Sequence, residues 1–160
     1  MNAPRILAAA VRSQHLVITV LSKGEILEVR RHVLPSGART CPALLRHIRE
    51  AAEDFDATML VVEPGTPCCS AATDSGLDTL RLRMIEVKNL FLPSGTPRTH
   101  EALFEEILKA HPRVSRLVRL VPGTFRVSLT ERKKTVSLLS LALGFAAHRT
   151  NESRPSIAMA

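Results

Sequence analysis

The apolar pattern at the start of the chain predicts a β-hairpin within a larger sheet. Residues 5–11 form a short apolar segment consistent with a strand, and residues 16–21 are apolar on both faces of an extended chain, as strands in the middle of a sheet are. Residues 22–25 are expected to form a tight turn, because Gly24 accepts the positive φ that such turns require. Residues 26–34 then return as an antiparallel partner.

Later segments alternate between helical and extended patterns. Apolar residues recur every three or four positions in three segments, which predicts helices at about 40–54, 99–110 and 131–148. Short apolar runs predict strands at 58–62, 87–92 and 117–121 and an edge or extended segment at 125–129, whereas 67–76 reads as a loop. The whole pattern predicts an α/β fold, with a mixed central sheet and an antiparallel hairpin at one side. It forms one domain over 1–149 with a flexible tail over 150–160.

Two stretches of the sequence read alike, at about 28–66 and 86–124. Each contains Leu-Pro-Ser-Gly, then Arg-Thr, a predicted helix, and a predicted strand that ends in Pro-Gly-Thr. The same features in the same order indicate a duplicated strand–loop–helix–strand unit. Right-handed crossovers would make its strands parallel, so the loops after them would gather at the carboxyl edge of the sheet, where α/β proteins usually bind ligands.

Both Leu-Pro-Ser-Gly loops precede a predicted helix N-terminus, where free backbone N–H groups favour an anion. We therefore expect two related anion or phosphate subsites, with the candidate residues Ser36, Arg39, Thr40, Ser94, Arg98 and Thr99. The alternative is that the small polar residues serve turns and caps while the arginines are solvated. Neither loop has a P-loop or dinucleotide-binding pattern, so no nucleotide cofactor is expected.

Glu63 is the strongest candidate for chemistry, because it ends an apolar strand at the presumed ligand edge. Carboxylates there are well placed to hold a divalent metal, and Asp74 and Asp78 follow in the predicted loop. No cofactor is otherwise expected, and magnesium is expected only if Glu63 is functional. The alternative is a solvated carboxylate at a strand end.

The first 63 residues resemble the start of a known fold. The segments LVITVLSKGEILEVRRHVL, PALLRHIREAAEDF and MLVVE are similar to the first half of the ribonuclease H-like fold, in the branch of the RuvC-type Holliday-junction resolvases. In that branch the first strand carries a catalytic Asp, the fourth ends in Glu, and a late helix carries further acids. The resemblance therefore implies a catalytic position for Glu63.

Other acids of that family pattern are missing. The first strand, Ile6–Val11, has no Asp, and Lys133–Leu139 in the last predicted helix has no acid. The resemblance thus implies a scaffold related to nucleic acids, and the missing carboxylates argue against ordinary metal-dependent nuclease activity.

The net positive charge of the chain favours a polyanionic partner. Among 160 residues, 22 are Lys or Arg and 15 are Asp or Glu, which gives a net charge of +7 and a pI of about 10.2. The candidate contacts to nucleic acid are Arg113, Arg116, Arg119, Arg126, Arg132, Lys133 and Lys134. Aromatic residues are only 3%, with no Trp or Tyr, which favours contact with the phosphate backbone over base stacking. A solvated basic surface, or contact with an acidic protein, is the alternative.

Cysteine usage and hydropathy bear on the compartment. Cys41, Cys68 and Cys69 make a poor disulfide set, so we expect free thiols in a reducing cytoplasm. The longest apolar stretch, 136–147, falls short of the roughly 20 residues that a membrane span requires, and no membrane partner is expected.

Three functions are compatible with these patterns. The leading one is a small basic ribonuclease H-like domain associated with nucleic acid and without full nuclease activity. The second is a hydrolase or transferase of a phosphorylated substrate that uses the Arg-Thr loops and Glu63. The third is an assembly subunit that docks a protein partner, or a second copy, through its sheet edge or its apolar C-terminal helix.

Overall fold

The computed structural model describes residues 4–114 and 132–153, and its centre is a five-stranded sheet with the order β3-β2-β1-β4-β5. The strands are β1 (Arg5–Arg12), β2 (His15–Ser22), β3 (Glu25–Val33), β4 (Met59–Val62) and β5 (Asp78–Arg81). β2 is antiparallel to β1 and β3, whereas β4 is parallel to β1 and β5 is parallel to β4. The predicted α/β fold with a mixed sheet and a hairpin is confirmed. The carboxyl ends of β1, β3, β4 and β5 therefore share one edge of the sheet.

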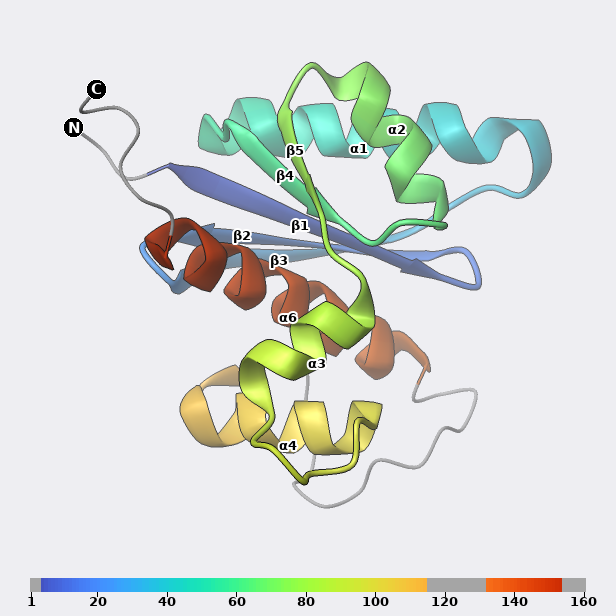
Figure 1. The fold of residues 1–160 in the computed structure, drawn as a ribbon. Coiled ribbons are helices and arrows are strands. Elements are labelled where there is room, and N and C mark those ends of the chain that lie inside the picture. The colour runs from blue at the N-terminus through green and yellow to red at the C-terminus, as the bar shows by residue number, and fades with distance from the viewer. Residues whose placement is uncertain (1–3, 115–131, 154–160) are drawn as a thin grey trace.

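Helices cover both faces of this sheet (Figure 1). A 3-10 turn, η1 (Gly37–Arg39), leads into α1 (Thr40–Phe55), which packs on one face together with α2 (Pro67–Ser75). α6 (Arg132–Ser153) lies across the other face. α3 (Met84–Phe91) and α4 (His100–Ala110) pack against the side of α6 that faces away from the sheet.

α6 is enclosed between two layers, and this explains its composition. Every residue from 136 to 147 is buried, including Leu138, Leu141 and Phe145. A helix that is covered on all sides is apolar all round, so it lacks the one-sided pattern of a surface helix. The apolar C-terminal helix is therefore buried within this chain. Neither α6 nor any other helix in the described ranges has the length and apolar character needed to cross a bilayer.

Small residues let α6 approach the sheet closely. A Cβ atom added to Gly144 would overlap Cδ1 of Leu21 on β2. One turn earlier, the Ser140 hydroxyl donates a hydrogen bond to the backbone oxygen of Ala8 at 2.7 Å. Thr19 Oγ1 lies 2.8 Å from Ser140 Oγ and donates to it, because the Ser140 hydrogen is already used. These buried groups are thereby satisfied and fix the register of α6 on β1 and β2.

Two predicted elements are wrong. The segment expected to be a strand at 87–92 belongs largely to α3, because Met84, Val87 and Phe91 form a helical stripe against α6. The segment 67–76, expected to be a loop, forms α2, which starts with Pro67 at its first turn and ends before Gly76.

The duplicated unit consequently does not begin with the same element twice. Its first copy starts with strand β3, and its second starts with helix α3. The strands expected at 117–121 and 125–129 lie outside the described residues. The other predicted strands and helices are confirmed, and the last helix continues to Ser153.

Replacing Gly144 with Val should destabilise the protein, because the added side chain has no space against Leu21. We expect a loss of about 1–3 kcal/mol in the free energy of unfolding, measured by urea denaturation. Glu105→Val, at an exposed position of α4, is the matched control for valine in a helix and should cost about 0.5 kcal/mol. Equal losses in the two variants would show that α6 is not closely packed.

Candidate functional site

Glu63 follows β4 directly and lies at the carboxyl edge of the sheet. The parallel register pairs Ala9 of β1 with Val62, so the next residue of β1, Ala10, stands beside Glu63. Side chains alternate between faces along a strand. Ala10 and Arg12 therefore share the face that α6 covers. The β1–β4 pairing thus brings the last residue of β1 to the candidate carboxylate.

Arg12 and Glu63 form an ion pair at this edge. Arg12 Nη2 donates to Glu63 Oε1 at 2.9 Å, and Arg12 Nη1 donates to the backbone oxygen of Val11 at 2.8 Å. The Glu63 side chain is 18% exposed and that of Arg12 is 36% exposed, so the pair is only partly screened by solvent. A guanidinium stays charged at all physiological pH values. The candidate catalytic carboxylate is consequently neutralised by a residue of the chain itself.

The cleft around this pair is narrow and mostly apolar. It is lined by Ala9, Ala10, Arg12, Glu63, Thr66, Met84, Leu139 and Leu143, and it has no room for a water molecule. Mg²⁺ requires near-octahedral oxygen ligation and usually keeps several of its waters. Glu63 is the single carboxylate of the cleft lining. The residues present here do not fit a magnesium site.

The other acids proposed for this site lie elsewhere. Asp78 begins β5 and pairs with Met59 at the amino end of β4, whereas Glu63 follows the carboxyl end. Asp74 lies in the last turn of α2 and is exposed. Within residues 4–114 and 132–153, no three His, Cys, Asp or Glu side chains come together as metal ligands.

The two Leu-Pro-Ser-Gly loops do not share a site. Ser36, Arg39 and Thr40 precede or begin α1 on one face of the sheet, whereas Ser94, Arg98 and Thr99 precede α4 on the other (Figure 1). Sequence reasoning placed both loops after strands, but the second follows helix α3. The structure therefore does not bring Arg39 and Arg98 together.

Several of the loop residues stabilise their own loops. The Arg98 guanidinium donates to Asn89 Oδ1, to the backbone oxygen of Pro93 and to that of Thr96, at 2.9–3.0 Å. Thr99 Oγ1 accepts from the backbone N–H of Ala102 at 3.1 Å, as a helix N-cap does. Arg39 is exposed and makes no such bond among the described residues. The anion-binding role of these loops stays a prediction.

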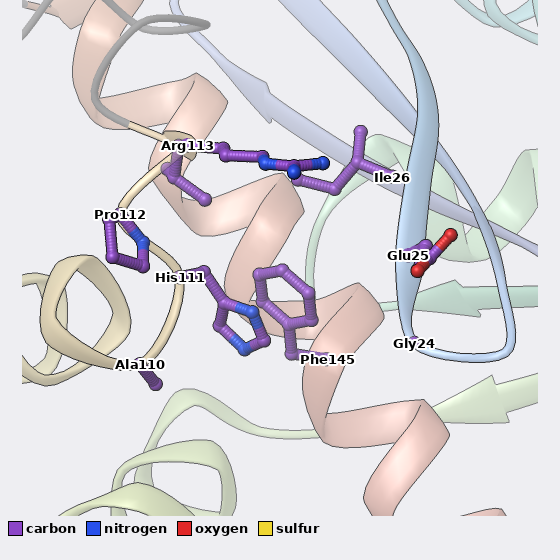
Figure 2. A pocket seen from close by; sticks show the side chains of 9 residues that line it. Gly24, Glu25, Ile26, Ala110, His111, Pro112, Arg113 and Phe145 are labelled. Atoms are coloured by element: carbon purple, nitrogen blue, oxygen red, sulfur yellow. The ribbon is translucent and has the colours of Figure 1, made fainter.

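Arg113 is the described member of the basic set proposed for nucleic acid. It is exposed and lines a pocket of about 550 Å³, together with Glu25 and the stacked rings of His111 and Phe145 (Figure 2). This pocket adjoins the turn between β2 and β3, at the sheet edge opposite Glu63. Arg116, Arg119 and Arg126 lie outside the described residues, and so do the side chains of Arg132, Lys133 and Lys134.

The cysteines are free thiols, as predicted. Cys68 is fully buried in α2, and this burial raises the pKa of its thiol to about 12. Cys69 accepts a hydrogen bond from Arg81 Nε at 3.1 Å and is only partly exposed. The Cys68 thiol is therefore protonated at neutral pH and is a poor nucleophile.

Sequence reasoning missed Lys88 and His100, which lie near the Arg12–Glu63 pair. Lys88 on α3 is 9% exposed, and its Nζ lies 3.5 Å from Nδ1 of His100, the first residue of α4. Burial, and then the charges of Lys88 and Arg12, lower the pKa of His100, while Glu63 acts in the opposite direction. No local signal in the sequence indicates this cluster, because it depends on how α3 and α4 pack.

Comparison with known proteins identifies the class of fold. No protein-family model and no curated protein matches the sequence. The structure of Thermus thermophilus RuvC in complex with a Holliday junction substrate is similar over 91% of this chain and 96% of that chain, with 12% sequence identity and a TM-score of 0.55. A second Thermus thermophilus RuvC structure gives the same coverage, 15% identity and a TM-score of 0.52.

These similarities show that the chain has a ribonuclease H-like fold. More narrowly, it is the RuvC type of that fold, as the segments up to Glu63 predicted. The sequence identities are low, so the similarity concerns the arrangement of the elements and not the chemistry of their side chains.

The Arg12–Glu63 pair should be measurable as a coupling free energy. In a double-mutant cycle with Arg12→Met and Glu63→Gln, we expect about 1 kcal/mol of coupling in urea unfolding, because the pair is partly shielded from solvent. The exposed pair Arg46–Glu50 on α1, at 3.9 Å, is the matched control and should give less than about 0.5 kcal/mol. Additive effects at Arg12 and Glu63 would contradict the pairing.

Proposed function

We propose that this protein binds nucleic acid through the phosphate backbone and does not cleave it by metal-dependent chemistry. The observation that carries the proposal is the ion pair between Arg12 and Glu63 in a cleft without room for water. It accounts for a nuclease-like fold whose central carboxylate is already neutralised.

Binding of nucleic acid is supported by fold and charge together. One of the similar RuvC structures holds a Holliday junction substrate. The present chain carries a net charge of +7 and few aromatic residues. Lys and Arg side chains that neutralise phosphates provide affinity independent of base sequence, and this affinity falls as salt rises. Because aromatic residues are few, the chain offers little surface on which bases could stack.

The donor set around Glu63 is unsuited to metal-dependent cleavage. Two-metal cleavage requires several carboxylates that converge so that the metals clamp both the attacking and the leaving oxygen. Glu63 has Ala10 beside it on β1, and Leu139 and Leu143 approach it from α6. The Arg12 guanidinium already supplies positive charge to the carboxylate. A second cation at Glu63 would have to displace Arg12 and open the cleft.

The carboxyl edge of the sheet is the proposed nucleic-acid face. Four strands end there, and the edge carries exposed cations, among them Arg81 at the end of β5 and Arg39 and Arg83 in the segments that follow β3 and β5. Arg83 is paired with Glu86, whereas Arg39 makes no ion pair or hydrogen bond within the described ranges. Arg39 is therefore the described cation at this edge that is best placed for a phosphate.

The other two functions find less support. The phosphorylated-substrate hypothesis requires Arg98, but its guanidinium donates hydrogen bonds to Asn89 and to its own loop. The apolar helix proposed to dock a partner is enclosed by the sheet and by α3 and α4.

Fluorescence anisotropy with a labelled duplex and a four-way DNA junction tests the proposal. We expect the dissociation constant to rise steeply between about 50 and 200 mM KCl, with no strand cleavage in Mg²⁺ or Mn²⁺. Arg39→Glu should weaken binding roughly 3- to 10-fold and reduce the salt dependence. Lys23→Glu, the same charge change in the turn at the opposite edge, is the matched control and should have a smaller effect.

Two results would overturn the proposal. Affinity that does not change with salt would contradict backbone binding. Cleavage that depends on Mg²⁺ and disappears in Glu63→Gln would show that Glu63 does serve a metal.

A further inference from the structure

Lys88 is an unusual lysine, because the residue is buried and no carboxylate among the described residues pairs with it. Its side chain lies within α3 at 9% exposure. Its polar contact in the described part of the chain is Nδ1 of His100 at 3.5 Å, and it forms no ion pair there. Lysines are rarely this buried unless a counter-charge balances them. Within residues 4–114 and 132–153, no anion therefore balances the charge of Lys88.

The position of His100 places this ammonium group at a helix N-terminus. His100 is the first residue of α4, a helix of 11 residues whose N-cap is Thr99. Backbone N–H groups in the first turn of a helix lack partners within the helix and carry the positive end of its dipole. His100 is exposed as a residue although its imidazole is partly desolvated, so solvent reaches the site from the His100 side, with Lys88 behind it.

Charges around His100 add to the positive potential. Burial lowers the pKa of His100 most, the charges of Lys88 and Arg12 lower it further, and Glu63 acts in the opposite direction. Lys88, Arg12 and Glu63 together carry one positive charge, and Glu101 in the first turn of α4 is an exposed carboxylate. A bound phosphate group would balance this charge and restore to Lys88 the counter-charge that it lacks.

We propose that Lys88, His100 and the N-terminus of α4 form a subsite for one phosphate group, with Arg12 contributing charge from its pair with Glu63. Lys88 and His100 are the direct ligands, since Arg12 already bonds to Glu63 and Val11. The subsite extends the proposed function. It rests on that function only for the natural source of the phosphate group. This source is either a nucleic-acid backbone or free phosphate.

Histidine-ring NMR tests the subsite with inorganic phosphate as the probe. At constant ionic strength in chloride, saturating phosphate should raise the pKa of His100 by about half a pH unit, because a nearby anion favours the imidazolium form. His111 has a pKa that burial lowers, and it packs on Phe145 away from this subsite, so it should not respond. Phosphate should also raise the melting temperature.

Lys88→Met is the decisive variant, and Lys109→Met on the exposed side of α4 is its matched control. Replacing a buried, unbalanced ammonium group with an apolar side chain should leave the melting temperature in chloride unchanged or higher. The variant should lose the phosphate effect on both His100 and the melting temperature, whereas the control keeps it. An equal response to phosphate in Lys88→Met, or none in the parent protein, would overturn the subsite.

A second arm separates the subsite from the function proposed above. A short oligonucleotide with a 5′-phosphate and the same oligonucleotide without it are added to the phosphate-bound protein. Displacement of phosphate by either one identifies the backbone or terminal phosphate of nucleic acid as the source. Saturable phosphate binding without displacement supports a subsite for free phosphate, and the salt-dependent anisotropy measurement described above then decides the proposed function separately.

Discussion

The close packing of α6 on β1 is the constraint on which the rest of the structure depends. Ala8 and Ala10 on β1 and Gly144 on α6 are small, so the helix backbone reaches the sheet, where Ser140 bonds to Ala8. The enclosed helix then supplies an apolar outer surface on which α3 and α4 pack. Without it, one face of the sheet and the inner sides of both small helices would be exposed to water.

The same packing determines the character of the site. Leu139 and Leu143 fill the space above Ala10, and Glu63 pairs with Arg12 on its own sheet instead of with a hydrated metal ion. Arg12 can pair with Glu63 because β1 and β4 are parallel, which brings the carboxyl ends of both strands to one edge. Positive charge from the chain thus stands where a hydrated metal ion has no room.

Much of the fold could be predicted from the sequence, because local patterns determine it. The hairpin follows from two apolar runs around Gly24, and β4 follows from a short apolar run ending at Glu63. The helix α3 could not be predicted, since a short apolar run looks the same in a buried strand and a buried helix. Identical Leu-Pro-Ser-Gly loops follow a strand once and a helix once, so the loop does not determine the element before it. The Arg12–Glu63 pair and the burial of Lys88 depend on contacts between distant segments, which no local spacing reveals.

Anomalous diffraction from crystals soaked in Mn²⁺ would test the central claim most directly, because the ion reports the position of any metal bound at Glu63. The account predicts that Arg12 stays paired with Glu63 and that no manganese peak lies within bonding distance of its carboxylate. A manganese ion coordinated by Glu63, with Arg12 displaced, would contradict the account.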